Sequence, residues 1–386
     1  MGKGVEPGNV LGETSEGMMT MQIEAETLRE WLDAQQPVTV LDVRTDEDRA
    51  QWAIPGSTHL NAYEALRAGE PGALADAAFP LDRPVVTVCN AGLVSQTAAE
   101  MLAERGFDAR SLAGGMKAWS LAWNAAEVPL PDQSCRVIQV RRTGKGCLSY
   151  VVGSSGEAAV IDPSVSVDVY LELADRHGWS IRYVLETHVH ADHLSRAREL
   201  VRQTGAVLLL PPQSRVRFAF TAIADGERIP LGSASLTAMR TPGHTDESTS
   251  YALNGVAVFT GDTLFTNGVG RPDLHAAPEA ARQRARALFT SLTRLHAFPP
   301  HTMVLPGHAS EPIAFDGRAV AAPMSDVETW LSGWLASEAA FVRRVTSKLP
   351  PTPPNFARIV ELNEAGEFPT TDPTNLEAGA NRCAVR

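Results

Sequence analysis

The stretch Thr187-His188-Val189-His190-Ala191-Asp192-His193 concentrates three imidazoles and one carboxylate in seven residues. A strand-like run, 181–186, precedes it, and a helix-like run, 194–203, follows it. The stretch is therefore predicted to lie on a loop at the carboxyl end of a strand, where α/β proteins build their sites. Because neutral imidazole and carboxylate are preferred ligands of zinc and iron, it predicts an α/β domain with a metal site.

Three later segments supply more potential ligands, each directly after an apolar strand-like run. They are Gly243-His244, Gly261-Asp262 and Gly307-His308. The alternative is a set of surface histidines with capping aspartates, but a metal pocket explains why every candidate follows a strand. The sequence thus offers seven candidate ligands: His188, His190, Asp192, His193, His244, Asp262 and His308.

Length and composition limit the class of protein. A chain of 386 residues suits two domains, and 44% hydrophobic with 20% charged residues is ordinary globular composition. The net charge of -11 argues against nucleic acid or an anionic membrane as a partner. The four cysteines form no CxxC pair, which indicates reduced thiols of a cytoplasmic protein. No apolar run approaches the roughly 20 residues that span a bilayer.

The chain divides into segments of different texture. Residues 1–20 lack the features of a secretory signal and are expected to be a disordered leader. Residues 21–125 alternate helix-like and strand-like runs, which predicts a parallel sheet covered by helices. Residues 126–134 contain two prolines and no periodicity, as expected of a linker. Residues 135–386 contain many strand-like runs with helices between them, which predicts a mixed sandwich.

Cys89 is the candidate nucleophile of the first segment. It ends the strand-like run from Val85 and begins Cys89-Asn-Ala-Gly-Leu-Val-Ser95, which opens a helix. Backbone N–H groups and a helix N-terminus would stabilise a thiolate there and any anion bound to it. A buried structural cysteine is the alternative, since free cysteine is among the most buried residue types.

The surroundings of Cys89 resemble the rhodanese domain. In order, the landmarks are Leu41-Asp-Val-Arg44, Ile54-Pro-Gly56, the Cys89 loop and Leu112-Ala-Gly-Gly-Met-Lys-Ala-Trp119. The resemblance implies that Cys89 carries sulfane sulfur as a persulfide. The rhodanese loop usually carries arginine after the cysteine and near its end, whereas this chain has Asn90 and Val94 or Ser95. Anion recognition then falls to backbone amides, and a docking domain without activity is the alternative.

The later segment resembles the metallo-β-lactamase superfamily, through the His188–His193 box with His244, Asp262 and His308. The resemblance implies an αββα sandwich with its metals at one edge of the two sheets. Members include zinc hydrolases such as glyoxalase II and the iron-dependent persulfide dioxygenases. Three runs favour the latter: Thr187–Leu194, Thr241–Thr245 with Ser248 and Tyr251, and Thr260–Phe265 leading to Gly268-Val-Gly-Arg-Pro-Asp-Leu274. Pro272 and Leu274 depart from the dioxygenase pattern Gly-Arg-Thr-Asp-Phe.

Two metal schemes remain open, because every ligand of both is present. The dioxygenase resemblance implies one Fe(II) per chain on His188, His244 and Asp262, with places left for substrate sulfur and O2. The remaining four would then orient ligands or handle protons: His190, Asp192, His193 and His308. In a dinuclear zinc thioesterase or lactonase, one metal would bind His188, His190 and His244, the other would bind Asp192, His193 and His308, and Asp262 would bridge them.

Three further residues are assigned near the site. Arg271 would clamp a substrate carboxylate by its planar fork, with a surface arginine as the alternative. Tyr251 would contact the substrate, with a core tyrosine as the alternative. Asp162 ends a strand facing the metal loop and is expected to hold a ligand histidine.

The expected function is oxidation of glutathione persulfide, or a similar small persulfide, to sulfite with O2, coupled to sulfane-sulfur transfer through Cys89. The expected partners are therefore a small persulfide or thiol, with neither nucleic acid nor membrane. Homo-oligomerisation is left open.

Overall fold

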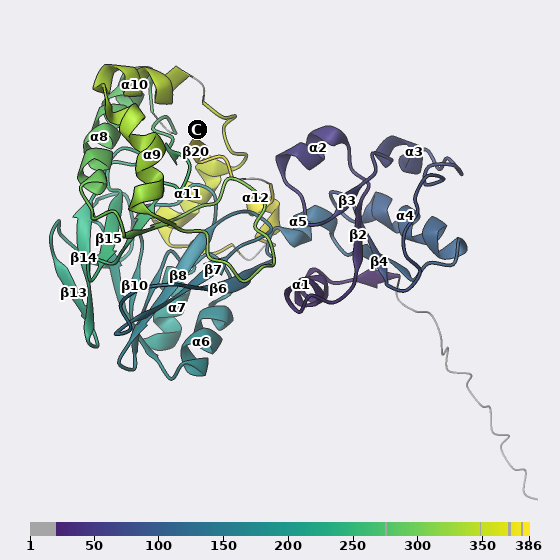
Figure 1. Ribbon diagram of the computed structural model, residues 1–386, viewed down its shortest axis with the longest axis horizontal. Helices are drawn as coiled ribbons and strands as arrows, with labels where there is room; N and C mark the ends of the chain where they lie inside the picture. The colour runs from purple at the N-terminus through teal and green to yellow at the C-terminus, as the bar shows by residue number, and fades with distance from the viewer. Residues whose placement is uncertain (1–20, 275, 348, 370–371, 380) are drawn as a thin grey trace, which may run out of the picture.

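The computed structural model describes residues 21–274, 276–347, 349–369, 372–379 and 381–386. Two domains lie side by side, with α5 (Gly115–Trp119) and α12 (Thr374–Glu377) at their junction (Figure 1). The leader expected over residues 1–20 lies outside the described residues. No helix in the described part of the chain is both long and apolar enough to cross a membrane.

The first domain is a parallel sheet between helices, as predicted. Its strand order is β1-β5-β4-β2-β3, and every described neighbour pair is parallel. The strands are β1 (Gln22–Ile23), β2 (Thr39–Asp42), β3 (Thr58–His59), β4 (Val85–Val88) and β5 (Ala109–Leu112). One apolar cluster joins the sheet to α3 (Tyr63–Arg67) and α4 (Leu93–Glu104), and a second joins it to α1 (Ala25–Asp33) and α5. Helix α2 (Asp46–Gln51) follows β2.

The second domain contains two mixed sheets. The first has the order β12-β11-β10-β9-β8-β7-β6. Its strands are β6 (Asn124–Val128), β7 (Arg136–Arg141), β8 (Leu148–Ser154), β9 (Glu157–Ile161), β10 (Ser180–Leu185), β11 (Val207–Leu210) and β12 (Thr221–Ala222). The second has the order β13-β14-β15-β16-β18-β19. Its strands are β13 (Arg228–Leu231), β14 (Ala234–Arg240), β15 (Thr249–Leu253), β16 (Ala257–Gly261), β18 (Met303–Pro306) and β19 (Ala322–Pro323).

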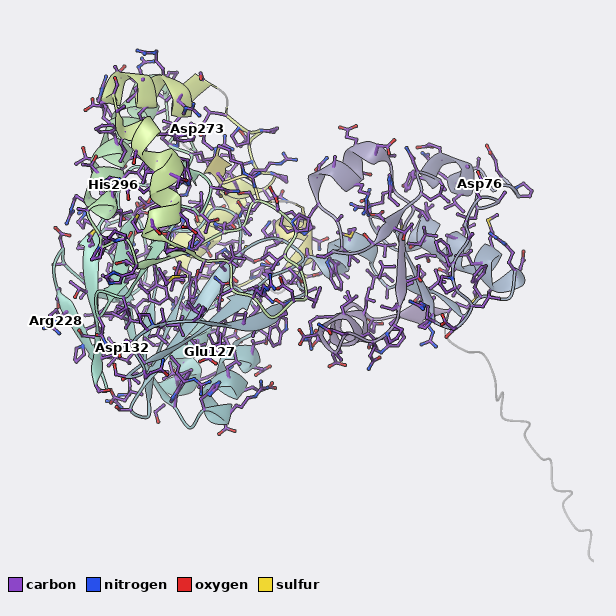
Figure 2. All side chains as sticks on the ribbon, in the orientation of Figure 1. Asp76, Glu127, Asp132, Arg228, Asp273 and His296 are labelled. Carbon is purple, nitrogen blue, oxygen red and sulfur yellow. The ribbon has the colours of Figure 1, made fainter. Side chains whose placement is uncertain are left out.

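Three apolar clusters define the layers of this domain. The first lies between the sheets and includes Tyr150 from one and Phe259 from the other, whose rings meet edge to face with centroids 4.9 Å apart. The second covers the first sheet with α6 (Val167–Arg176) and α7 (Ala197–Thr204). The third covers the other sheet with α8 (Pro278–His296), α9 (Met324–Leu335) and α10 (Glu338–Ser347). Side chains fill these layers (Figure 2), so the αββα sandwich is confirmed.

The junction differs from the predicted linker at 126–134. Strand β6 pairs with β7 in antiparallel register from Asn124 opposite Arg141 to Val128 opposite Val137, so the second domain begins earlier. Ala126 and Val128 are buried, which explains why this stretch pairs as a strand. Pro129 follows directly, and residues 129–135 connect β6 to β7 within the same sheet.

The end of the described chain contacts both domains. After α11 (Phe356–Ala365), residues 372–379 and 381–386, here called the bridging segment, contain α12 and β20 (Ala384–Val385). Strand β20 pairs with β17 (Val269–Gly270) in the second domain. Toward the first domain, Lys117 Nζ donates to Asn375 Oδ1 at 2.5 Å, and Arg382 donates to Gln51 at 3.2 Å.

Candidate metal centre

The seven predicted ligands meet at one edge of the two sheets. Four lie on the loop after β10, and the other three follow β14, β16 and β18. The loops are near one another because each of these strands delivers its carboxyl end to this edge. All seven side chains are buried: His188, His190, Asp192, His193, His244, Asp262 and His308.

Three of them form a compact group. Asp262 Oδ2 lies 3.6 Å from His244 Nε2 and 4.0 Å from His188 Nε2. Among the described residues, His188 Nε2 and Asp262 Oδ2 are buried without a hydrogen-bond partner. A metal bound at about 2.1 Å would hold neighbouring ligand atoms about 3–3.5 Å apart, so a slight contraction would suffice. Unpaired buried donors and acceptors are costly, and a cation among these atoms would satisfy them.

The electrostatics of this group suit a cation. Burial lowers the pKa of both His188 and His244, which favours the neutral imidazole that binds metal. Burial opposes a charge on Asp262, but the surrounding His308, His244 and His188 keep the pKa of its carboxyl below the ordinary value. His244 Nδ1 lies 2.8 Å from the carbonyl oxygen of Arg271, which as acceptor leaves Nε2 as the ligating atom.

His190 is held differently from its neighbours. Its Nε2 lies 2.9 Å from Glu186 Oε2 and 3.2 Å from Asp162 Oδ1, so Asp162 contacts one histidine of the predicted ligand set. Its Nδ1 has no hydrogen-bond partner among the described residues. Glu186 went unrecognised in the sequence, although an acid at the last position before the histidine-rich loop was the available signal.

A second group of potential ligands adjoins the first. His308 bridges two carboxylates, with Nε2 2.5 Å from Asp192 Oδ2 and Nδ1 2.5 Å from Asp262 Oδ1. His193 Nδ1 lies 3.2 Å from Asp192 Oδ1, and the Cys147 thiol donates to Asp192 Oδ2 at 3.3 Å. One atom from each of Cys147, Asp192, His193 and His308 lies within 4.8 Å of the others. Cys147 could not be placed here from the sequence, because the strand-like run around it looks like ordinary core.

The bridging segment reaches into this centre. Asn381 Nδ2 donates to Asp192 Oδ2 at 2.8 Å, and Cys383 lies within 4.8 Å of ligand atoms of Asp262 and His308. Glu377 accepts from the backbone N–H of Leu194, next to His193. Residues more than a hundred positions from the histidine-rich loop thus complete its surroundings, which no local pattern could predict.

The two residues expected to contact substrate are engaged elsewhere. Arg271 is 1% exposed, and its guanidinium forms a fork-like pair with Asp273, with both N–O distances 2.8 Å. It also donates to the carbonyl oxygens of Pro351 and Arg382, which fixes the end of the chain. Tyr251 is fully buried, and its hydroxyl donates to the carbonyl oxygen of Glu186 at 2.9 Å. Both therefore support the scaffold in this structure.

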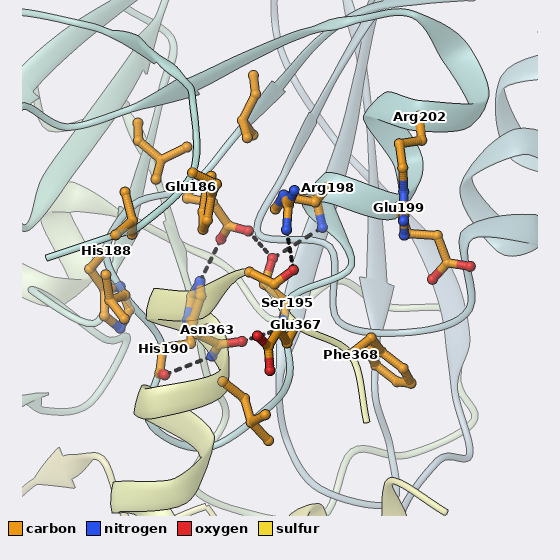
Figure 3. A pocket seen from close by; sticks show the side chains of 18 residues that line it. Glu186, His188, His190, Ser195, Arg198, Glu199, Arg202, Asn363, Glu367 and Phe368 are labelled. Atoms are coloured by element: carbon orange, nitrogen blue, oxygen red, sulfur yellow. Dashed lines mark hydrogen bonds and ion pairs between the residues drawn. The ribbon is translucent and has the colours of Figure 1, made fainter. Parts of the chain in front are cut away.

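A cavity of about 460 Å³ adjoins the histidine-rich loop, which contributes His188, Val189 and His190 to its lining. Figure 3 shows His188 and His190 on one side of it, and Arg198 and Arg202 of α7 opposite. Apolar side chains from β11, the following loop and α11 form much of the remaining wall: Leu208, Leu210, Val216, Phe218 and Leu362. An apolar cavity with a few convergent charges has the character of a small-molecule site. The sequence signal for it was two arginines one helical turn apart, directly after the loop.

Cys89 occupies the expected loop in the first domain. Its Sγ accepts hydrogen bonds from Gly92 N–H at 3.1 Å and Ser95 Oγ at 3.2 Å, and the residue is 2% exposed. Gly92 has φ +87°, and a Cβ there would lie 2.9 Å from Gly114 N, so only glycine fits. The loop therefore directs hydrogen-bond donors at sulfur without a cationic side chain of its own.

Comparisons with known proteins assign both domains. The model of the rhodanese-like domain matches residues 24–122, and that of the metallo-beta-lactamase superfamily matches residues 142–308. Curated relatives named hydroxyacylglutathione hydrolase include those of Methylococcus capsulatus, 37% identical over 157 residues, and Rhodospirillum rubrum, 34% identical over 158. Each match covers 40% of this chain and 58% of the relative.

Two solved structures share the fold of the second domain. ETHE1 from Myxococcus xanthus is 29% identical with a TM-score of 0.52, covering 60% of this chain and 98% of that one. A metallo-beta-lactamase from Staphylococcus aureus is 25% identical with a TM-score of 0.55, covering 62% and 75%.

Proposed function

We propose that this chain, a rhodanese-like domain followed by a metallo-β-lactamase-fold domain, oxidises a glutathione-based persulfide at one iron ion held by His188, His244 and Asp262. The reaction consumes RSSH, O2 and H2O and yields RSH and H2SO3. An iron ion held by these side chains would supply the redox chemistry with O2 and open positions for sulfur.

The observation that carries this proposal is the division of the histidines. His188 and His244 group with Asp262, whereas His190 groups with Asp162 and Glu186. A set of two histidines and one carboxylate is typical of non-haem Fe(II) oxygenases. The sequence resemblance to persulfide dioxygenases agrees with this set, and ETHE1 of Myxococcus xanthus, matched over 98% of its length, agrees with the extent of the domain.

The cavity beside His188 suits the organic part of the substrate. Its apolar wall accepts the carbon skeleton, while Arg202 and the remaining donors of Arg198 are available to carboxylates. Arg198 also donates to the carbonyl oxygen of Gly366 and lies over the Phe218 ring. These arginines take the part that the sequence had suggested for Arg271. A glutathione moiety is supported by the printed name of the curated relatives, hydroxyacylglutathione hydrolase.

The first domain would move sulfane sulfur through Cys89. The donors from Gly92 and Ser95 stabilise a thiolate, which is the form that accepts and releases sulfur. Persulfide is then an intermediate common to both domains.

A second candidate is a dinuclear zinc thioesterase with a docking domain. It is favoured by the second ligand group around Asp192 and His308, and by His190 Nδ1, which is free to bind metal. In that case the two metals would hold the hydroxide that attacks a thioester.

Metal content and O2 uptake distinguish the two. We expect about one iron per chain after anaerobic purification, and O2 uptake when glutathione persulfide is added. Two zinc ions per chain with cleavage of a glutathione thioester, and no persulfide-dependent O2 uptake, would overturn the proposal in favour of the hydrolase.

A further inference from the structure

A pocket of about 390 Å³ lies between the two domains, next to the loop of Cys89. Because β2, β4 and β5 are parallel, the loops that follow them meet at one edge of the sheet. The segments after these strands contribute Arg44, Asn90, Ala91 and, from α5, Lys117 to the pocket. Asn90 and Ala91 directly follow Cys89, so the pocket adjoins the sulfur-carrying loop.

The opposite wall belongs to the second domain. Thr374, Asn375 and Ala378 of the bridging segment line it. In Figure 1, α12 lies against α5, where Lys117 and Asn375 meet. The bridging segment thus forms one wall of the pocket beside the Cys89 loop. The volume of the pocket suits a small molecule, since pockets of roughly 300–1,000 Å³ hold drug-sized ligands.

One cation of the pocket has donors to spare. Arg44 is buried, with its guanidinium donating to both oxygens of Asp42 and to the carbonyl oxygens of Asp48 and Trp52. Lys117 is 39% exposed at its side chain, and its ammonium donates to Asn375, with Asp372 4.0 Å away. An ammonium has three donors, so Lys117 can bind a further anionic group.

We propose that this pocket binds the small thiol that exchanges sulfane sulfur with Cys89, and that Lys117 binds a carboxylate of that thiol. The inference rests on the proposed sulfur transfer at Cys89 and adds the recognition that its loop lacks. Lys117 lies on α5, directly after β5, so it supplies from outside the Cys89 loop the positive charge that an arginine within that loop would supply.

The exchange conserves atoms and electrons. In one direction, the Cys89 thiolate attacks the outer sulfur of R–S–SH, a bond from Sγ to that sulfur forms, and the S–S bond of the donor breaks. The electron pair and the negative charge leave with the thiolate R–S⁻. The reverse step, with R–S⁻ as the attacking group, regenerates the Cys89 thiolate and R–S–SH, so no oxidant or reductant is needed.

The test compares two persulfides that differ in charge. Thiocyanate formation from cyanide is measured with glutathione persulfide, which has carboxylates, and with the persulfide of 2-mercaptoethanol, which has none. We expect Lys117→Gln to raise KM for glutathione persulfide about three- to tenfold, the range for one partly exposed charge pair, with kcat little changed. KM for the neutral persulfide should not change. Arg67→Gln on α3, an exposed charge outside the pocket, is the matched control and should behave as wild type.

A second variant and a binding measurement separate the possible failures. Ala378→Trp should fill the pocket and raise KM for both persulfides. Equal KM values in wild type, Lys117→Gln and Ala378→Trp, with Cys89-dependent transfer intact, would overturn the pocket. If no transfer occurs at all, binding of the unreactive S-methylglutathione decides. Binding weakened by Lys117→Gln would then support the pocket and refute transfer at Cys89, whereas binding unaffected by either variant would overturn both.

Discussion

Replacing Glu377 with glutamine should destabilise the second domain strongly, because Glu377 neutralises a buried arginine. Arg142 and Glu377 are both 0% exposed at their side chains and are 2.7 Å apart, and Arg196 lies 3.8 Å from the same carboxylate oxygen. Glutamine keeps the shape and one acceptor, but leaves two arginines without a counter-charge. Removing one partner of a buried pair costs about 3–5 kcal/mol.

The expected shift is large enough to measure by thermal unfolding. For a domain of roughly 250 residues, 1 kcal/mol changes Tm by about 2–4 °C, so the lower estimate of about 3 kcal/mol predicts a decrease of about 6–12 °C. The assay is circular dichroism of the full chain. Glu279→Gln is the matched control, because Glu279 pairs with Arg282 on the surface, where an ion pair contributes about 1 kcal/mol or less.

The pH dependence gives an independent check. Burial opposes the charge of Glu377, but Arg142 and Arg196 hold the pKa of its carboxyl below the ordinary value of 4.5. Because the pKa of Glu377 is lower in the folded state, its charge stabilises the fold at pH values above 4.5. This stabilisation is lost as the pH falls through the folded-state pKa. The difference between wild type and Glu377→Gln should therefore shrink in acid. If Glu377→Gln lowers Tm no more than Glu279→Gln at neutral pH, the counter-charge argument is wrong.

Three further predictions concern the metal centre, Cys89 and the buried carboxylate of Asp42. His244→Ala should lose tightly bound iron, whereas His308→Ala and the control His296→Ala at the end of α8 should retain most of it, as measured by elemental analysis; equal loss from the first two would indicate two metals. Cys89→Ser should abolish sulfur transfer to cyanide yet leave oxidation of added glutathione persulfide nearly unchanged; loss of both in O2-uptake assays would make Cys89 an obligatory carrier. Burial opposes a charge on Asp42, but neighbouring arginines lower the pKa of this carboxyl from 3.8. Its charge should therefore stabilise the fold above pH 3.8, and this stabilisation should be lost as the pH falls through the folded-state pKa. The free energies of unfolding of Asp42→Asn and wild type should accordingly differ at neutral pH and converge in acid.

The sequence predicted the sheets and the metal loop because their signals are local. Each ligand followed an apolar strand, and parallel strands place such positions at one edge of a sheet. The helices between 278 and 347 were not predicted, although Pro278 followed by Glu279 is a typical helix start. The end of strand β6, from residue 126, was assigned to a linker because the prolines after it dominated the pattern, while its pairing with β7 depends on a partner that the local sequence does not reveal.

Residues whose role depends on distant partners could not be placed from the sequence. Arg271 looked available for a substrate, but Asp273 and the end of the chain bind its guanidinium. Cys147 and Cys383 belong to no CxxC pair in the sequence, and the fold brings both beside the ligand groups. The arginines of α7 could be proposed to bind a substrate only from the structure, because the cavity that they line also needs residues of β11 and α11.

The bridging segment sets an order of events in biosynthesis. Its residues leave the ribosome after residues 21–369, and domains fold as units during synthesis, beginning from the N-terminus. Both sheets can therefore form while Asn381 and Cys383 are still absent, leaving the histidine-rich loop less covered than in the finished fold. We expect metal to bind most readily during synthesis, before the bridging segment has packed against the histidine-rich loop. Once that segment is in place, we expect metal exchange to be slow.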